Sequence, residues 1–286
     1  MRLKCRLRGG MREKKMELST LCREINLQPE IKDKVLDFEK NFDFKTVEQQ
    51  LNDFSVYNKM EKARTELKTI LGEDNDNIKI LTCMLKASAF AYKTYKIKVI
   101  SDEIYFSTMK CYTRFIDETY QRTGRLYFDR DWWTARQAGC HLFRIGSLEY
   151  EINRSENKII IELHIPSNTD FSPSAVEQSL KHAKQFFDKY YAEIKNADYY
   201  CHSWLLDRQL EEMLKEKSNI ISFQKRFEIL NEGEADTEFI EWVFHRNAAD
   251  YADYINFPED TSLQRNIKKH LISGGVIRTA RGKIKF

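Results

Sequence analysis

The chain has 286 residues, 42% hydrophobic and 13% aromatic, which is enough to bury the core of one large domain or of two ordinary ones. Its formal net charge of +3 is concentrated at the start, because residues 1–15 hold seven Lys or Arg and one acidic residue, and the remainder carries −3. The body therefore gives no general electrostatic reason to expect a nucleic-acid or an anionic membrane partner.

Residues 1–15 form a basic leader, which we expect to be either a disordered tail or a non-native translated segment, since Met11 and Met16 offer later starts. The leader lacks the apolar stretch of about 7–15 residues found in a secretory signal. No later run reaches the ~18 uninterrupted apolar residues of a membrane span. We therefore expect a cytoplasmic protein. Its six cysteines have no C-x-x-C spacing, which favours reduced thiols over a disulfide framework.

Residues 16–127 are predicted to form a helical domain. The stretch PEIKDKVLDFEKNF places apolar residues at helical spacing, and KTVEQQLNDF repeats the pattern. NKMEKARTELKTILG ends at Gly72, and NIKILTCMLKASAFAYKTY follows as a further helix. The last predicted helix, SDEIYFSTMKCYTRFIDETYQRTG, opens with Ser101 as a cap and closes at Gly124. No catalytic constellation is visible in this domain.

In residues 128–286 the helical spacing gives way to short strand-like segments, and an α+β domain is predicted. HLFRIGSLEYEI indicates two short strands about Gly146, and KIIIELHI a third strand. The helix PSAVEQSLKHAKQFFDKYYAEI and the strand DYYCHSWLL follow. We further expect strands in ISFQKRFEIL and TEFIEWVF, a short helix in RQLEEMLK, and a last helix in TSLQRNIKKHLISGG before VIRT. This order predicts a mixed, largely antiparallel sheet with flanking helices and one strand–helix–strand crossover.

The C-terminal order of elements resembles a GNAT-type N-acyltransferase. The segments LFRIGSLEYE, LHIPS, CHSWLL, SNIISFQKRF and TSLQRNIKKHLISGG are similar to those of two-domain bacterial acyltransferase-like proteins, which join a helical N-terminal domain to a GNAT-like C-terminal domain. The resemblance covers essentially the whole chain after the leader. It implies acyl-CoA, with acetyl-CoA as the expected form, as a co-substrate whose thioester is attacked by an amine beside the central strand.

The turn between the third strand and the next helix is the implied binding site for the CoA pyrophosphate. The resemblance assigns this role to the backbone after the strand and at the helix start, at Ile165, Ser167, Ser174, Ala175 and Val176. Pro173 suits the first helical position with Ser172 as cap, although a register with Ser174 as cap and Glu177 as its partner is also open. GNAT enzymes usually carry two glycines in this loop. HIPSNTDFSPSA has none, which weakens the case for CoA and leaves a simple connecting turn as the alternative.

The strand IIIELHI supplies the first catalytic candidates. Alternation places Glu162 and His164 on one face, together with Ile160, and the remaining apolar residues on the other. Either polar side chain could take a proton from an attacking amine. The alternative is that Glu162 pairs with a cation across the sheet and His164 donates to a carbonyl.

The strand YYCHSWLL adds Tyr200 and His202 on one side, and a tyrosine of a GNAT-type enzyme often protonates the leaving thiolate. Tyr199 is equally open as this acid, and aromatic core packing is the alternative for both tyrosines. In the last helix and beyond it, Arg265 and Arg278 could reach a phosphate of CoA or remain on a solvated surface. Zinc is not expected, because the cysteines and histidines lack the short spacing of structural zinc sites.

These observations favour an acyl-CoA-dependent N-acyltransferase that transfers an acyl group to a small amine by direct attack on the thioester. A non-catalytic GNAT-like binding or interaction module is the alternative. The polar residues on the central strand favour the enzyme, whereas the missing glycines favour the module.

Overall fold

The computed structural model of the chain describes residues 15–154, 158–246 and 251–286. The predicted leader therefore lies, except for residue 15, outside the described residues. Of the six cysteines, Cys5 also lies outside them, and the other five are free thiols. Among the described residues, no helix has the length and apolar character needed to cross a lipid bilayer.

The first half of the chain is helical, as predicted. Its helices are α1 (Leu18–Glu24), α2 (Pro29–Asn41), α3 (Glu48–Asp53), α4 (Met60–Leu71), α5 (Ile78–Ile97), α6 (Asp102–Met109), α7 (Cys111–Thr123) and α8 (Asp131–Ala138). Ser101 caps α6 by accepting from the backbone N–H of Ile104, and Gly72 and Gly124 end α4 and α7 at positive φ. The single helix expected after Ser101 is divided at Lys110 into α6 and α7.

The second half contains a six-stranded sheet. Its strands are β1 (Leu142–Ile145), β2 (Leu148–Arg154), β3 (Ile159–His164), β4 (Tyr199–Ser203), β5 (Phe227–Ala235) and β6 (Arg278–Ile284), in the order β1-β2-β3-β4-β6-β5. Only β3 and β4 run parallel, and α9 (Pro173–Tyr190) is the crossover between them. The α+β prediction, with a mixed and largely antiparallel sheet, is confirmed.

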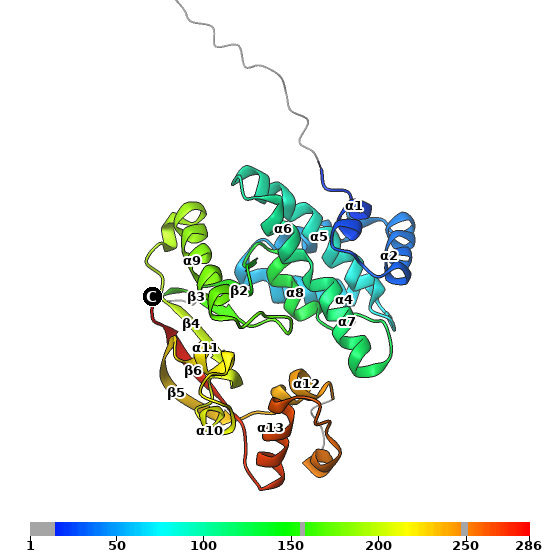
Figure 1. The fold of residues 1–286 in the computed structure, drawn as a ribbon. Helices are drawn as coiled ribbons and strands as arrows, with labels where there is room; N and C mark the ends of the chain where they lie inside the picture. Colours follow the sequence, from blue (N-terminus) through cyan, green and yellow to red (C-terminus); the bar gives the residue numbers. More distant parts are fainter. Residues whose placement is uncertain (1–14, 155–157, 247–250) are drawn as a thin grey trace, which may run out of the picture.

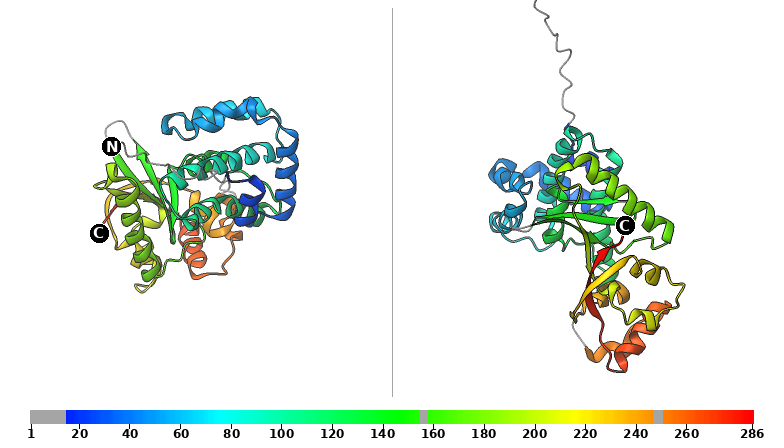
Figure 2. Two further views of the ribbon diagram at one scale, coloured as in Figure 1. Left: turned by 90° about the horizontal axis from the view of Figure 1, so that it is seen from above. Right: turned by 90° about the vertical axis from the view of Figure 1, so that its left-hand side faces the viewer.

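The helix α9 covers one face of the sheet. Its Val176, Leu180, Ala183 and Phe187 are buried, and its Ser179 hydroxyl lies 2.9 Å from the hydroxyl of Tyr150 on β2. The helices α4 to α8 lie on the other side of β1 and β2 (Figure 1). Two further views show the same arrangement, with the last helices forming a separate layer below the sheet (Figure 2). The two faces of β2 and β3 therefore have different surroundings.

Three elements of the second half differ from the sequence-based expectation. TEFIEWVF forms the helix α12 (Glu238–Phe244) rather than a strand, because Phe239, Ile240, Val243 and Phe244 recur at helical spacing and are all buried. ISFQKRFEIL is split into α11 (Asn219–Gln224), capped by Ser218, and β5. The helix before β4 ends at Tyr190 rather than near Ile194. The short helix α10 (Leu210–Met213) and the final helix α13 (Ser262–Ile272) are confirmed.

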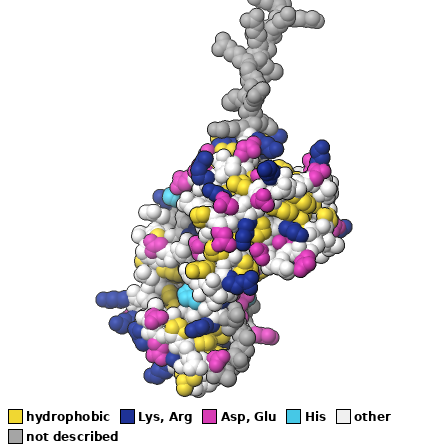
Figure 3. Space-filling view, turned by 90° about the vertical axis from the view of Figure 1, so that its right-hand side faces the viewer, with side chains coloured by type: hydrophobic (Ala, Val, Ile, Leu, Met, Phe, Trp, Pro, Cys, Tyr) yellow, Lys and Arg dark blue, Asp and Glu magenta, His cyan; other side chains and the backbone are white. Residues whose placement is uncertain are grey.

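The buried side chains form two hydrophobic clusters. The larger cluster runs without interruption from the N-terminal helices through the sheet to α9, and the smaller one lies under α12 and α13. Ile165 and Phe171, in the connection that follows β3, pack against both clusters. The end of β3 therefore lies where the two clusters meet. The protein surface on the face drawn in Figure 3 mixes positive and negative side chains without a large patch of one sign.

Candidate active site

The parallel strands β3 and β4 part near their carboxyl ends. Their ladder runs from Ile161 and Tyr199 to Leu163 and Cys201 and ends there, although β3 continues to His164 and β4 to Ser203. A cavity of about 860 Å³ opens where the strands diverge. Cavities of this size at the ends of sheet strands are common sites for small ligands.

Polar side chains of β2 and β3 gather on the sheet face that is turned away from α9. Glu151 lies opposite Glu162, and Glu149 lies opposite His164, in the antiparallel ladder. All four line the cavity. The alternation predicted for β3 is confirmed, because Ile161 and Leu163 on the other face are buried in the core.

His164 is held by a buried carboxylate. Its Nε2 lies 2.9 Å from Glu151 Oε2, and Arg136 Nε of α8 donates to Glu151 Oε1 at 3.1 Å. Burial disfavours the charged form of Glu151, but the contacts with His164 and Arg136 outweigh it and hold the pKa of this carboxyl below its ordinary value. Trp133 packs edge-on against the imidazole, with 4.8 Å between ring centroids. With Nε2 donating to Glu151, the lone pair of a neutral imidazole is on Nδ1.

Glu162 has a different environment. Arg281 NH2 donates to Glu162 Oε1 at 2.6 Å, and the Arg281 guanidinium lies over the ring of Tyr200, 4.7 Å from its centroid. The cation pairing that the sequence left open as an alternative for Glu162 is therefore present. One oxygen of Glu162 is thus engaged by Arg281, whereas Nδ1 of His164 is not used in the contact with Glu151, which leaves His164 as the better placed candidate base on geometry.

Three of the four catalytic candidates reach the cavity. Glu162, His164 and His202 line it, with His202 exposed on the last part of β4. Tyr200 does not line it, since its hydroxyl is directed to Asp198 at 3.4 Å. Tyr199 is buried on the other face against Phe187.

The residues predicted to bind CoA divide into two groups. Ile165 and Ser167 line the cavity, and the Ser167 hydroxyl donates to Glu118 of α7. Ser174, Ala175 and Val176 start α9 outside the lining, in the register with Pro173 first, and the Ser172 side chain makes no capping hydrogen bond.

The two predicted phosphate-binding arginines do not line the cavity. The guanidinium of Arg265 donates to the carbonyls of Glu259 and Asp260, in the turn before α13. Arg278 begins β6, where its backbone N–H donates to Asp207. Their assignment to CoA stays a prediction.

One wall of the cavity is apolar. This apolar wall comes from the connection after β3, from the short turn that follows β4, and from α11, α12 and α13. It consists of Phe171, Trp204, Leu205, Ile220, Val243 and Leu263. The polar part of the lining comprises the polar sheet face with Arg136, and side chains of α12 and α13 such as Glu238, Glu241 and Gln264. Such a division suits a ligand with one apolar arm and one reacting polar group.

Sequence reasoning missed Arg136, Glu151 and Arg281. The carboxylates of LEYE, two residues apart in a predicted strand, show the same alternation that identified Glu162 and His164, so Glu151 could have been found. The arginines come from distant segments and have no such local signal. In residues 15–154, 158–246 and 251–286, no group of three or more His, Cys, Asp or Glu side chains is arranged to hold a metal ion.

Two family models match the chain. The N-acyltransferase N-terminal domain matches residues 16–140, and the GNAT-like C-terminal domain matches residues 122–284. Fold and site together define a two-domain GNAT-like acyltransferase. The chain belongs to the family with this GNAT-like C-terminal domain, and the predicted resemblance is confirmed. The predicted domain boundary, between residues 127 and 128, falls in the overlap of the two matches.

Several solved structures share the fold. A crystal structure of an acyltransferase in complex with decanoyl-CoA and teicoplanin is 21% identical, with a TM-score of 0.77 over 94% of this chain and 87% of that one. A mutant acyltransferase in complex with octanoyl-CoA is 20% identical, with a TM-score of 0.75 over 93% and 86% of the two chains. No curated protein matches the chain. At these identities, the solved structures support the shared fold alone.

Proposed function

We propose that the protein is an acyl-CoA-dependent N-acyltransferase in which His164 is the general base. The observation that carries this proposal is the pair of His164 and the buried Glu151, which faces a cavity at the point where β3 and β4 part. A scaffold has no need for a buried carboxylate that orients an imidazole toward an open cavity.

In the proposed reaction, His164 Nδ1 takes a proton from the ammonium form of the acceptor. The freed amine attacks the thioester carbonyl, and the carbon–sulfur bond breaks to release CoA as a thiolate. The nitrogen gives up its second proton as the amide forms, and this proton balances the one that the thiolate takes up. Glu151 stabilises the imidazolium that forms during this transfer. His202, which lines the same cavity from β4, is the best placed side chain to return a proton to the thiolate.

The pantetheine arm of the co-substrate is proposed to enter the opening between the ends of β3 and β4, and this is supported by Ile165 and Ser167, which line the cavity there. The free backbone donors at the start of α9 would then face the pyrophosphate, as the first-turn N–H groups of a helix favour an anion. This part of the proposal is supported by the absence of a side-chain cap at Ser172.

The acyl group is proposed to be longer than acetyl. The apolar wall with Phe171, Leu205 and Leu263 offers far more surface than a two-carbon group can cover. The structurally similar acyltransferases were crystallised with octanoyl-CoA and decanoyl-CoA. The acceptor is proposed to be a primary amine, and in one of those structures teicoplanin is bound, so the acceptor need not be small.

Isothermal titration and a thiol-release assay test the proposal. We expect decanoyl-CoA to bind more tightly than acetyl-CoA, and both to bind more tightly than ATP. With a primary amine present, the wild-type protein should release CoA, and His164→Ala should lower the rate by about 10²- to 10⁴-fold with little change in CoA affinity. Tight binding of ATP, or an undiminished rate in His164→Ala, would contradict it.

A further inference from the structure

A second cavity of about 600 Å³ adjoins the first. The two cavities share part of their lining, and the shared side chains form the wall between them. These are Arg114, Glu118, Ser167, Glu241, Trp242 and His245. Ser167 in this shared wall follows His164 by three residues along the chain. The second cavity thus adjoins the first close to the proposed base.

The two cavities differ in chemistry. The second cavity has no counterpart of the apolar wall and is lined chiefly by hydrogen-bonding side chains, including Asn26, Lys110, Thr113, Asp117, Gln121 and Asn168. These side chains supply amide, hydroxyl, carboxylate and ammonium groups at short intervals, and Trp242 adds an aromatic surface. An acyl chain would gain little here, because its methylene groups would displace water from polar groups without replacing the hydrogen bonds.

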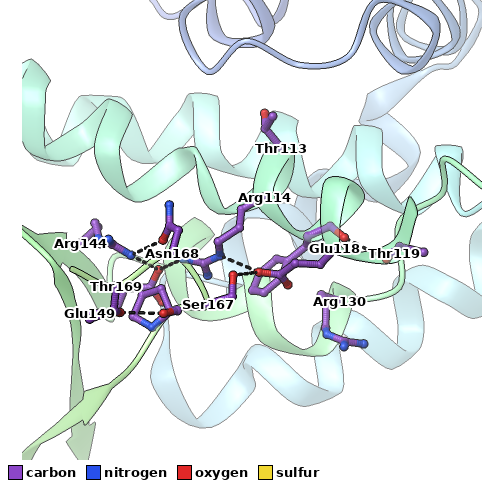
Figure 4. Close-up of polar contacts among 12 residues, drawn as sticks. Thr113, Arg114, Glu118, Thr119, Arg130, Arg144, Glu149, Ser167, Asn168 and Thr169 are labelled. Carbon is purple, nitrogen blue, oxygen red and sulfur yellow. Dashed lines mark hydrogen bonds and ion pairs between the residues drawn. The ribbon is translucent and has the colours of Figure 1, made fainter. Parts of the chain in front are cut away.

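The shared wall contains polar atoms without hydrogen-bond partners. Glu118 Oε2 and Arg114 Nε are buried and make no hydrogen bond with the described residues, although Arg114 Nε lies 3.4 Å from Glu118 Oε1. Burial raises the pKa of Glu118 above its ordinary value. Figure 4 shows Arg114 and Glu118 projecting from α7 toward Ser167, Asn168 and Glu149. Since unpartnered buried polar atoms are costly, a ligand that bonds to this wall would be stabilised there.

We propose that the second cavity binds the body of the acceptor, and that this body is rich in hydroxyl or amide groups. The proposal rests on the function proposed above, and it goes further by assigning a place and a chemical class to the acceptor. The acyl-CoA would occupy the first cavity along its apolar wall, the acceptor body would occupy the second, and the amine would pass the shared wall to reach His164 Nδ1.

A matched pair of amines tests this assignment. n-Hexylamine and 1-amino-1-deoxyhexitol both carry a primary amine on a six-carbon chain, and they differ only in the hydroxyl groups. With decanoyl-CoA as donor, kcat/KM for the aminohexitol should exceed that for hexylamine at least tenfold. Triglycine amide is a third acceptor, which carries amide groups in place of hydroxyl groups. Whichever polar amine has the larger kcat/KM relative to hexylamine shows which group the cavity prefers. No preference for either polar amine over hexylamine would overturn the proposal.

Gln121→Trp fills the second cavity from α7, and Gln185→Trp is the matched control. Both glutamines are exposed on helices, and Gln185 on α9 lines neither cavity. We expect Gln121→Trp to lower the preference for the polar amine at least tenfold, and the control to leave both rates unchanged. Equal losses with both amines in Gln121→Trp would refute the proposal, because they would indicate general damage.

A binding measurement separates this inference from the proposed reaction. Titration of the aminohexitol into the CoA-saturated protein should detect binding to the wild type that Gln121→Trp removes. If that binding occurs while no amine is acylated, the cavity assignment holds and the proposed acyl transfer fails. If amines are acylated and the aminohexitol binds Gln121→Trp as well as the wild type, the reaction holds and the cavity assignment fails.

Discussion

Replacement of Glu151 by Gln tests whether this carboxylate acts through His164. The two side chains are nearly equal in size, so the substitution leaves no void in the wall. It removes a negative charge whose side chain is only 6% exposed and which lies 2.9 Å from His164 Nε2. Arg136 also loses its charged partner, but its side chain is 27% exposed and can be hydrated. The main consequence should therefore fall on the imidazole.

The expected magnitude follows from these contacts. Glu151 orients the imidazole and stabilises the positive charge that His164 acquires when it takes a proton, so Glu151→Gln should lower kcat. General-base catalysis contributes roughly 10²- to 10⁴-fold, which sets the upper limit for the loss of kcat in Glu151→Gln. The affinity for acyl-CoA should change little.

The assay is CoA release at one fixed pH for the wild type, Glu151→Gln, His164→Ala and the double variant. If Glu151 acts through His164, its removal should have almost no further effect in the His164→Ala background. A Glu151→Gln loss of the same factor in both backgrounds would refute the reasoning.

Three further changes have expected outcomes. Burial lowers the pKa of His141 from 6.5 to about 4, so stability is complete above about pH 6.5 and should fall by about 3 kcal/mol as the pH drops toward 4. Urea unfolding should show that His141→Gln loses this pH-dependent part. Hydrogen bonds with Lys158 and Lys283 lower the pKa of Asp198 to about 2, and its stabilising effect, present above about pH 4, should be lost toward pH 2. Since the Asp198 side chain is 28% exposed, Asp198→Asn should cost only about 1 kcal/mol at pH 7 by the same assay, and nothing near pH 2. Leu263→Trp reduces the space beside the apolar wall and should lower the ratio of decanoyl-CoA turnover to acetyl-CoA turnover about tenfold or more. Turnover measured with a series of acyl-chain lengths would test this.

The polar face of β3 could be predicted because its cause is local. Successive side chains of a strand point to opposite faces, and the buried Ile161 and Leu163 determine which face the core takes. Glu162 and His164 then have to share the other face. The crossover through α9 was also predictable, since the strand, proline-containing turn and amphipathic helix are consecutive in the chain.

The same reasoning fails where a short apolar run fits two periods. TEFIEWVF has the composition of a strand, but its buried residues are spaced for a helix. The segment is so short that its sequence is compatible with both periods. In the sheet β4 pairs with β6 and β6 pairs with β5, so this segment takes no place among the strands and packs as a helix. A decision of this kind depends on tertiary structure and cannot be read from the segment itself.

The side chains that contact Glu162 and Glu151 cannot be predicted from the local sequence either. Arg281 meets Glu162 only because β6 lies beside β4, and Arg136 meets Glu151 only because α8 packs across the sheet. Sequence alone therefore presents Glu162 and His164 as equal candidates. The structure separates them, since one carboxylate is held by a guanidinium while the imidazole is oriented by another carboxylate.

The structure also changes which feature carries the enzymatic interpretation. The start of α9 is only moderately suited to a phosphate, because its loop has no glycine and Arg226 donates to the carbonyl of Pro173 and pairs with Glu177 in the first turn. Helix starts without ligands are common, so this feature distinguishes little. The divergence of β3 and β4 is more specific, because it opens a cavity directly beside an oriented imidazole. The proposed acyl transfer needs a base and space for the thioester at the same place, and the divergence of the two strands brings the candidate base and the cavity together.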